Sequence, residues 1–497
     1  MKLSNILPAQ EYLTDHPLGD PEITDVTDKP CNVTEGCLFF LIRGFRFDAE
    51  KLLISVLSRR PAAVVVERIP EGYDNTIPLL LVPSVRRAYA FALYRFLGID
   101  GEKLNLIGIT GTNGKTTTAS LLFRILSEAG HRVGMFGTGQ IRIGDRLLTA
   151  SDYAMTTPDP DVLYPALKQM LQEGVSDVVM EVSSHALALD KVAPLFFSYG
   201  IFTNLSAEHL DFHTTMEDYY AAKSKLFRQC RIGIVNADDA WCDRIIRDAT
   251  CQIVRVGAVF EGDIMAKNIR DLGMEGSSFL FRAPGLSFLV SLKLPGLYNI
   301  YNAILALTAA ISMGIPPCQA KESVASLPFV PGRLETVCEF PRVIVDYAHT
   351  EAALRSVLKT VCQGKPHDVR AITVFGCGGE RDREKRPKMA AAAEEFSDYT
   401  IVTSDNSRGE ATADILRDIL RGFHERTRHC VISDRKHAIE AAVEMATDRD
   451  IIIVAGKGHE RYITDKTGTH PFDERKIILE AVKKKKGGHT NQHEDKT

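Results

Sequence analysis

A glycine-rich heptapeptide, Gly111-Thr112-Asn113-Gly114-Lys115-Thr116-Thr117, stands between two segments of different periodicity. The apolar run before it, residues 104–109, is typical of a strand. The segment after it is typical of a helix that ends at Gly130, with apolar residues at helical spacing: Ala119, Leu122, Phe123 and Leu126. A glycine-rich turn between a strand and a helix lets successive backbone N–H groups face a phosphate chain. The pattern therefore predicts a phosphate-binding loop in an α/β domain.

The side chains of this loop predict how it would hold a nucleotide. Lys115 would reach the terminal phosphates, and the Thr116 hydroxyl would bind Mg²⁺. The strict Walker pattern needs a glycine at position 109, where this chain has Ile109, so the loop is a shorter G-x-x-G-K-T variant. The alternative, a surface turn with a chance lysine, leaves the matching strand and helix unexplained.

The rest of the chain alternates between short apolar runs and helical segments, which is typical of parallel, doubly wound sheets. Strands are expected at residues 37–42, 62–66, 178–182, 200–203 and 232–235, and beyond a hinge at Pro331-Gly332 at 342–345, 371–375, 399–403, 431–432 and 450–455. Helices are expected at 412–423 and 436–445. We predict an α/β chain of three domains: a small N-terminal module (1–98), a central P-loop doubly wound sheet (99–334) and a C-terminal Rossmann-like domain (335–484), with a disordered tail (485–497).

Composition excludes several classes of protein. The 497 residues include 60 Lys+Arg and 64 Asp+Glu, a net charge of −4 that argues against binding nucleic acid by charge alone. Apolar runs such as 79–82 and 451–454 are too short to span a membrane, and the first residues lack the apolar core of a signal peptide. The ten cysteines include no Cys-x-x-Cys pair, which favours reduced thiols over a disulfide framework or a zinc site. We expect a cytoplasmic enzyme.

Three polar segments are ambiguous when each is taken alone. Glu181 ends an apolar strand, where a metal-bound phosphate would lie, but a lone Glu at such a position is more often a strand-end salt-bridge partner. His209 and His213 are four residues apart, which suggests a metal pair only if that stretch is helical; ordinary structural histidines are the alternative. Lys223, by itself, looks like an exposed helix lysine.

Taken in order, these segments resemble the Mur ligase family over residues 20–482. The quoted order is GTNGKTT, TTP (156–158), EVSSHAL, NLSAEHLDFH, AAK, LPGLYNIYNA, VPGRLE, DYAHT and GCGGERDREKRPKM. Within the family, the sequence is most similar to the enzymes that add the third amino acid to the peptidoglycan precursor UDP-MurNAc-L-Ala-D-Glu. The resemblance implies an ATP-dependent, cytoplasmic amide ligase that works through an acyl phosphate.

The resemblance also assigns residues to ATP and metal. It implies ATP binding by Gly111, Thr112, Asn113, Gly114, Lys115, Thr116, Thr117, Asn302, Arg333 and Asp346. Two Mg²⁺ sites are implied at Thr116, Glu181, His209 and Lys223, the last as a lysine carbamylated by CO₂, which would turn a cation into an anionic oxygen ligand. The implied catalytic residues are Lys115, Lys223 and His209.

The remaining assignments concern the two other substrates. UDP-MurNAc-dipeptide contacts are implied for Lys29, Thr156, Thr157, Ser183 and Lys191. The chain departs from the family at Leu189 and Lys191, where Gln and Arg are usual, at Thr27-Asp28-Lys29 in place of Asp-Ser-Arg, and at Asp48-Ala49 in place of Asp-Gly. Amino-acid contacts are implied for Arg381, Asp405, Asn406, Ser407, Arg408, Gly456 and Glu460.

Asp405-Asn406-Ser407-Arg408 indicates which amino acid is added. Members that add meso-diaminopimelate have Asp-Asn-Pro-Arg here. The arginine would bind the distal carboxylate through two hydrogen bonds and would repel the ammonium of lysine. A plain strand-to-helix turn is the alternative, because Asp, Asn and Ser favour such turns. Ser407 in place of proline is expected to loosen the turn and to aim Arg408 less firmly.

Other functions stay open at this point. They are ligation of L-lysine or another diamino acid, a folylpolyglutamate synthetase, a P-loop switch or motor, and a paralogue that binds nucleotide sugar without turnover. We expect a monomer whose partners are small molecules, with no nucleic acid and no membrane.

Overall fold

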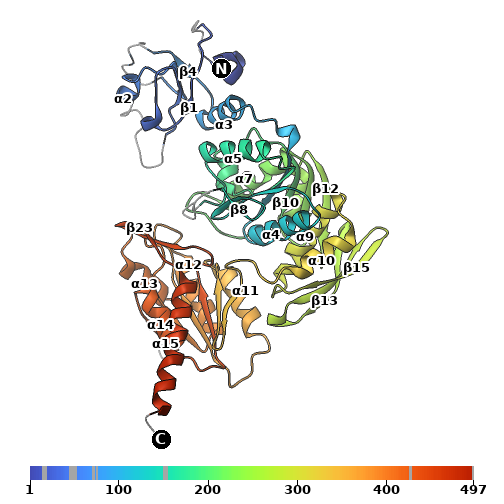
Figure 1. The fold of residues 1–497 in the computed structure, drawn as a ribbon, viewed down its shortest axis with the longest axis vertical. Coiled ribbons are helices and arrows are strands. Elements are labelled where there is room, and N and C mark those ends of the chain that lie inside the picture. Colours follow the sequence, from blue (N-terminus) through green and yellow to red (C-terminus); the bar gives the residue numbers. More distant parts are fainter. Residues whose placement is uncertain are drawn as a thin grey trace.

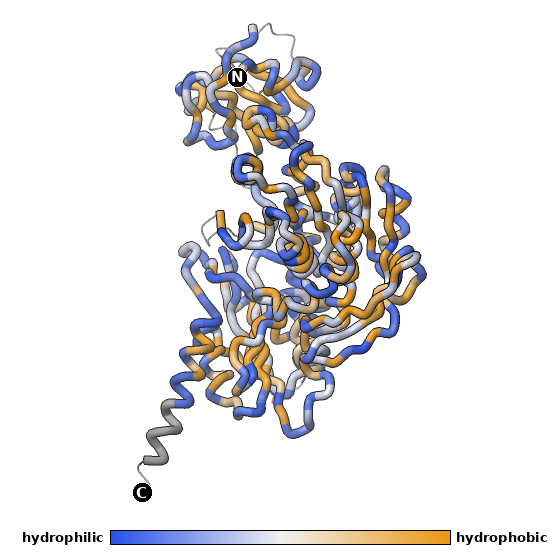
Figure 2. Tube along the Cα trace, turned by 45° about the vertical axis from the view of Figure 1, so that its right-hand side comes forward, coloured by the Kyte–Doolittle hydropathy of each residue, from blue (hydrophilic) through white to orange (hydrophobic). Residues whose placement is uncertain are grey.

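The computed structural model describes residues 1–13, 19–43, 53–69, 73, 77–148, 155–424 and 428–494. Its three principal sheets follow one another along the chain, and the N-terminal and C-terminal sheets lie at opposite ends of the central one (Figure 1). Hydrophobic segments gather inside each of the three units, and hydrophilic ones lie mainly on their outer loops and helices (Figure 2). Within the described residues, no helix has the length and apolar character needed to cross a membrane. The predicted α/β architecture is confirmed.

The N-terminal unit is a small parallel sheet with the strand order β1-β2-β3-β4. Its strands are β1 (Val26–Thr27), β2 (Leu38–Phe40), β3 (Ala63–Val66) and β4 (Leu79–Leu81), so the expected strands at 37–42 and 62–66 are present but shorter. Helices α1 (Leu3–Ile6), α2 (Leu53–Leu57) and α3 (Val85–Phe96) accompany it. Helix α3 starts at an N-cap, Ser84, whose side chain accepts a hydrogen bond from the Arg87 N–H, and it contacts the central unit through α5.

The central unit is an eleven-stranded sheet with the order β15-β14-β13-β12-β11-β10-β5-β9-β6-β7-β8. Its strands are β5 (Asn105–Thr110), β6 (Val133–Gly137), β7 (Gln140–Ile143), β8 (Arg146–Leu147), β9 (Asp177–Glu181), β10 (Phe197–Phe202), β11 (Cys230–Asn236), β12 (Gln252–Gly257), β13 (Ile264–Asp271), β14 (Ser277–Ala283) and β15 (Leu286–Leu292). The strands from β13 through β12, β11, β10, β5 and β9 to β6 are parallel, and both ends of the sheet are antiparallel hairpins.

Helices cover both faces of this sheet, which explains the continuous apolar run in β5. Leu106 packs in the core shared with α5 (Pro160–Gln172) and α7 (Met216–Ser224), whereas Ile107 and Ile109 pack with α4 (Lys115–Glu128) and α9 (Tyr298–Ser312). The shorter helices are α6 (Ser184–Ala188), α8 (Cys242–Asp248) and α10 (Pro317–Ser326).

The C-terminal unit is a six-stranded sheet with the order β16-β17-β21-β18-β19-β20, in which only the edge strand β16 is antiparallel among the described residues. Its strands are β16 (Glu335–Glu339), β17 (Arg342–Asp346), β18 (Ala371–Phe375), β19 (Tyr399–Val402), β20 (His429–Val431) and β21 (Ile451–Ala455), with a separate hairpin of β22 (Tyr462–Asp465) and β23 (Gly468–Pro471). Helices α11 (Glu351–Cys362), α12 (Lys385–Phe396) and α13 (Thr412–Leu420) share one core, and α14 (Arg435–Met445) and α15 (Glu474–Glu494) share the other.

The end of the chain differs from the expected tail. Helix α15 continues to Glu494, past residue 485, and residues 495–497 lie outside the described part. The Lys485 ammonium donates to the carbonyls of Val443 and Glu444 at the end of α14, which ties this part of α15 to its neighbour. These contacts depend on the tertiary packing of two helices, which the polar composition of the segment does not reveal.

Candidate active site

The phosphate loop has the conformation that its glycines predict. Gly111 (φ +150°) and Gly114 (φ +87°) occupy backbone conformations that other residues rarely adopt. A Cβ at Gly114 would lie 2.3 Å from Asn302 Oδ1. The Lys115 ammonium donates to the carbonyls of Gly111 (2.9 Å) and Thr112 (2.8 Å), so it lies folded over its own loop. Burial lowers the pKa of Lys115, and the nearby carboxylates oppose that shift.

Thr116, in the first turn of α4, and Glu181, the last residue of β9, lie together. The Thr116 hydroxyl donates to Glu181 Oε2 (2.9 Å), and the Thr138 N–H donates to Glu181 Oε1 (3.0 Å). Arg333, from the hinge, donates to the Thr116 hydroxyl (3.3 Å). The Glu181 side chain is fully buried without a basic partner among these contacts. A hydroxyl and a carboxylate are the hard oxygen donors that Mg²⁺ prefers, so this pair fits the predicted ion.

Lys223 is a buried residue, which corrects the interpretation of its helix position as exposed. Only 2% of its surface is accessible, its ammonium donates to the Gly111 carbonyl (2.8 Å), and Nζ lies 4.5 Å from the centre of the Tyr219 ring. Burial first, and then the charge of Lys115, lower its pKa well below the usual value. This shift makes the neutral amine, the form that reacts with CO₂, more accessible than it is for an exposed lysine.

His209 does not form a helical metal pair with His213. His209 lies in a loop with φ +57°, and α7 begins only at Met216, so the condition for that pairing is not met. His213 forms a hydrogen bond with Ser184 (2.9 Å), a structural role. Burial lowers the pKa of His209 to about 3, so its imidazole is neutral near pH 7 and available as a ligand.

Glu208 joins the central and C-terminal units, and sequence reasoning gave it no role. Its Oε1 lies 2.9 Å from Nε2 of His349, which follows β17. Burial would raise the pKa of Glu208, but the hydrogen bond with His349 and the charges of His209 and Lys115 hold it well below the usual range. Glu208 is therefore a fixed negative charge beside the phosphate loop.

A cavity of about 340 Å³ between the two units collects most of the residues predicted to bind ATP. Those that line it are Asn113, Gly114, Thr116, Thr117, Asn302, Arg333 and Asp346, while Gly111, Thr112 and Lys115 lie behind them. Asp346 accepts hydrogen bonds from the N–H groups of Leu334 and Ala348 (both 2.7 Å), and so holds the hinge in shape. Arg333 lies 4.5 Å from the centre of the Tyr347 ring.

A second cavity, of about 470 Å³, lies between residues 206–211 and the C-terminal strand ends. Six of the seven residues predicted to bind the amino acid line it: Arg381, Asp405, Asn406, Arg408, Gly456 and Glu460. Ser407 is buried in the same loop and does not line the cavity. Arg381 forms an ion pair with Asp211 across the two units (3.5 Å). The cavity is lined by both cations, among them Arg381 and Arg408, and carboxylates, among them Asp405 and Glu460.

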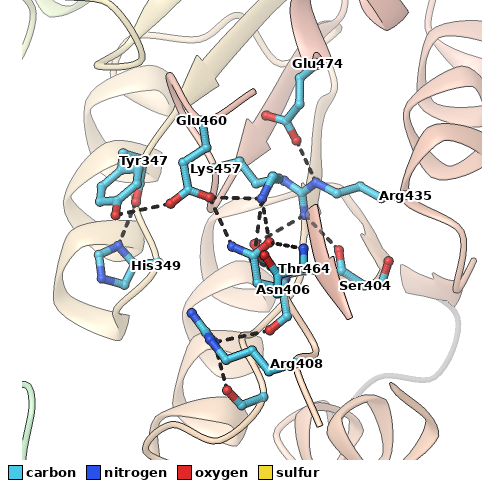
Figure 3. A network of polar contacts seen from close by, with 12 residues as sticks. Tyr347, His349, Ser404, Asn406, Arg408, Arg435, Lys457, Glu460, Thr464 and Glu474 are labelled. Carbon is cyan, nitrogen blue, oxygen red and sulfur yellow. Dashed lines mark hydrogen bonds and ion pairs between the residues drawn. The ribbon is translucent and has the colours of Figure 1, made fainter. Parts of the chain in front are cut away.

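Arg408 is fixed in the loop, although Ser407 was expected to loosen it. Its side-chain Nη1 donates to the carbonyls of Gly379 (2.8 Å) and Asn406 (3.2 Å), and its backbone N–H donates to the Thr464 carbonyl (3.0 Å). Both side-chain bonds use Nη1, so within the described residues Nη2 and Nε stay available to a ligand (Figure 3). Backbone carbonyls therefore orient the Arg408 guanidinium.

The predicted contacts of the nucleotide-sugar substrate form two groups. In the first, the Thr157 hydroxyl donates to the Glu181 carbonyl (2.8 Å) and accepts from the Ser183 N–H (2.9 Å), and Thr138 donates to the Thr156 hydroxyl (3.1 Å). These residues lie directly beside Glu181 at the end of β9.

In the second group, two lysines pair with aspartates near the start of α5. Lys191 lies 2.6 Å from Asp159, and Lys29, from the N-terminal unit, pairs with Asp161. Residues 48–49, the site of another expected departure, lie outside the described residues. The structure thus brings Lys29 and Lys191 to one helix end, each with an acidic partner.

Comparison with known proteins decides the family. The Mur ligase middle domain matches residues 109–310, and the Mur ligase, glutamate ligase domain matches residues 332–458. A relative from Aquifex aeolicus, UDP-N-acetylmuramoyl-L-alanyl-D-glutamate--2,6-diaminopimelate ligase, is 39% identical over 463 residues, or 93% of this chain and 94% of the relative. The chain belongs to the Mur ligase family. A relative of the same name from Bacillus cereus is 38% identical over 97% of this chain and 98% of its own length.

Solved structures agree with this membership. A structure of UDP-N-acetylmuramoyl-L-alanyl-D-glutamate--2,6-diaminopimelate ligase matches with a TM-score of 0.68 and 29% identity, over 97% of this Mur ligase and 99% of that chain. The Mycobacterium tuberculosis folylpolyglutamate synthase matches with a TM-score of 0.63 at 18% identity, over 76% of this chain and 93% of that chain. At that identity the likeness concerns the fold alone. The predicted family and fold are confirmed.

Proposed function

We propose that this Mur ligase joins meso-diaminopimelate to UDP-MurNAc-L-Ala-D-Glu through an amide bond, with ATP as the energy source. The central supporting observation is that the two cavities share lining residues: Ser206, Tyr347, His349 and Ala352. A phosphoryl group transferred in one cavity would therefore lie next to an amine bound in the other. Proximity of this kind is a principal source of rate in two-substrate reactions.

The proposed reaction has two steps and uses only ATP, the precursor and the amino acid. The D-Glu carboxylate oxygen attacks the γ-phosphorus of ATP, ADP leaves, and an acyl phosphate forms. The amine of the incoming amino acid then attacks the acyl carbon, inorganic phosphate leaves, and the nitrogen loses a proton. Lys115, now folded over its own loop, would turn toward the phosphates and offset the charge that develops on the phosphoryl oxygens.

We propose that the metal ligands are Thr116, Glu181, His209 and a carbamylated Lys223. Mg²⁺ bound there would supply Lewis acidity toward the phosphoryl oxygens. The buried Glu181 carboxylate, and the buried Lys223 amine with its lowered pKa, are the features that support this set. Carbamylation would exchange the hydrogen bond that Lys223 makes to Gly111 for two anionic oxygens in the same place.

The choice of meso-diaminopimelate rests on the charges in the amino-acid cavity. Arg408 and Arg381 suit the distal carboxylate of diaminopimelate, and Glu460 suits its distal ammonium. L-Lysine has the ammonium without the carboxylate and would leave the Arg408 guanidinium without a carboxylate partner. We further propose that the protein acts as a monomer and in the cytoplasm, where its nucleotide substrates are found.

An amino-acid panel tests this proposal. The protein, ATP, Mg²⁺ and UDP-MurNAc-L-Ala-D-Glu are incubated with meso-diaminopimelate, L-lysine, L-ornithine or no amino acid, and product mass and phosphate release are measured. We expect product with meso-diaminopimelate, rejection of L-lysine, and phosphate release that needs both the precursor and the amino acid. A preference for L-lysine would refute the specificity, and equal phosphate release without substrates would refute the ligase itself.

A further inference from the structure

Lys457 is a fully buried cation directly behind the amino-acid cavity. It follows Gly456 in the loop after β21, none of its surface is accessible, and it does not line the cavity. Its ammonium donates to Asn406 Oδ1 (3.1 Å) and to Glu460 Oε2 (3.0 Å), and it lies 4.0 Å from Asp405 Oδ1 (Figure 3). Lys457 therefore contacts three residues that line the cavity, Asn406, Glu460 and Asp405, although it does not line the cavity itself.

These contacts fix the orientation of the Asn406 amide. Its Oδ1 accepts two hydrogen bonds, from Lys457 and from the Thr464 N–H (2.9 Å), so this end of the amide must be the oxygen. Its Nδ2 then donates one hydrogen to Glu460 Oε2 (3.1 Å), which leaves the second hydrogen for a ligand. Removal of Lys457 would leave only one donor on the oxygen and would permit the amide to rotate.

The same contacts fix the Glu460 carboxylate. Oε2 accepts from both Lys457 and Asn406, whereas Oε1 lies 3.5 Å from the Tyr347 hydroxyl, another residue of the cavity. Two donors thus hold one carboxylate oxygen, whereas the other has only the long hydrogen bond from the Tyr347 hydroxyl and can also accept one from an ammonium. A carboxylate held at one oxygen keeps the direction of the other.

Charge supports the same role for Lys457. Lys457 lies 3.0 Å from Glu460 and 4.0 Å from Asp405, so its one positive charge faces two carboxylates. Arg435 is fully buried, lies 2.6 Å from Glu474, and donates to the Ser404 and Ala455 carbonyls at the ends of the two strands concerned. Burial opposes ionisation of Asp405, but Lys457 and Arg435 lower its pKa to about 2.

We propose that Lys457 is a positioning residue for the incoming diamino acid: it orients the Asn406 amide and the Glu460 carboxylate so that they receive the carboxylate and the ammonium of that substrate. The proposal rests on the proposed function, and it deepens it by identifying a residue that sets specificity without touching the substrate. Its effect should be confined to the amino acid, because neither the nucleotide cavity nor the phosphate loop contacts Lys457.

Two substitutions separate its hydrogen bonds from its charge. Lys457→Met keeps the length of the side chain and removes both, while Lys457→Gln keeps one donor and removes the charge. Lys365→Met is the matched control, because Lys365 is a poorly exposed, ion-paired lysine of the same unit, 3.1 Å from Asp398 and outside both cavities. Each purified variant is assayed for KM toward each of the three substrates, for kcat, for Tm, and for the product ratio with mixed meso-diaminopimelate and L-lysine.

We expect Lys457→Met to raise KM for meso-diaminopimelate by about 10- to 100-fold, as for the loss of charged hydrogen bonds. KM for ATP and for the precursor should stay within about twofold, and the preference over L-lysine should fall, since Glu460 and Asn406 lose their alignment. Lys457→Gln should lie between wild type and Lys457→Met. Lys365→Met should lower Tm without changing any KM.

Two outcomes would overturn the proposal. One is an unchanged KM for the amino acid and an unchanged product ratio in Lys457→Met. The other is an equal rise in all three KM values, which would indicate a purely structural role. The unmutated protein reports the proposed function separately: if it adds a different amino acid, the same KM ratios are measured with that amino acid, and the role of Lys457 is still decided.

Discussion

Substitution of Arg408 by alanine tests the specificity of the amino-acid cavity most directly. Nη1 of Arg408 is engaged by the carbonyls of Gly379 and Asn406, which fixes the guanidinium and leaves Nε and Nη2 for a carboxylate. Burial lowers the pKa of this guanidinium, and the neighbouring Arg381 adds to that shift, so the site lacks a full counter-charge until a carboxylate binds.

The size of the effect follows from this geometry. Truncation of one partner of a buried, hydrogen-bonded charge pair costs about 2–5 kcal/mol, which is about 30- to 4,000-fold in kcat/KM. Arg381 lines the same cavity and retains part of the attraction for a carboxylate, so we expect the lower part of that range, about 30- to 300-fold. Use of L-lysine should change little, because lysine has no distal carboxylate to lose.

The assay measures kcat/KM for meso-diaminopimelate and for L-lysine with wild type, Arg408→Ala and a control, Arg417→Ala. Arg417 lies on α13 in the same unit, and its side chain is 66% exposed beside Asp414, so its loss should change neither value. The reasoning would be refuted if Arg408→Ala lost activity equally with both amino acids, or if it kept wild-type use of meso-diaminopimelate.

Three further predictions concern other parts of the molecule. Lys223→Ala should abolish product formation, because the nitrogen that would take up CO₂ is gone; bicarbonate should not restore activity, whereas short carboxylates should restore a part, and wild-type turnover would contradict the assignment. Glu208→Gln weakens the charged contact with His349, so it should lower kcat by about 10-fold or more while precursor binding, measured by calorimetry, stays the same. Burial alone would raise the pKa of Asp450, but hydrogen bonds from Arg370 and Thr447 lower it to about 2. The stabilising effect of the ionised Asp450 is therefore present above about pH 4 and is lost as the pH falls toward 2. Asp450→Asn should therefore cost about 1–2 kcal/mol near pH 7 after allowance for the half-exposed arginine, and the gap in Tm should close in acid; a gap independent of pH would contradict this reading.

Much of the fold was predictable because its signals are local. The strand expected at 371–375 is β18 with the same bounds, and the one expected at 104–109 is β5 shifted by one residue. Apolar runs buried on both faces mark such strands clearly. The antiparallel hairpins at the sheet edges, such as β13 to β15, gave no comparable signal, because their burial alternates between exposed and buried residues.

The site was predictable where a motif lists its residues in order, and not where function depends on contacts between distant segments. The burial of Lys223 depends on Gly111, 112 residues away, and no helical pattern reveals it. Glu208 and His349 each stand in a recognisable motif, but their pairing spans 141 residues and two sheets. Lys457 was overlooked because a buried lysine has no periodic signature; only the contacts with Asn406 and Glu460 identify it.

Both halves of the site stand at the carboxyl ends of parallel strands, where ligands of α/β sheets bind. The phosphate loop follows β5 in one sheet, and the amino-acid loops follow β19 and β21 in the other. Three polar contacts join the halves, Arg333 to Thr116, His349 to Glu208, and Arg381 to Asp211. Met274 and Tyr298 of the central unit also pack against the C-terminal core. Polar contacts of this kind exchange with water at a small net cost, so we expect the two sheets to separate when substrates enter and to close again around them. Under the proposed function, closure would bring the amine to the acyl phosphate and exclude water, and a site divided between two sheets would in this way favour ligation over hydrolysis.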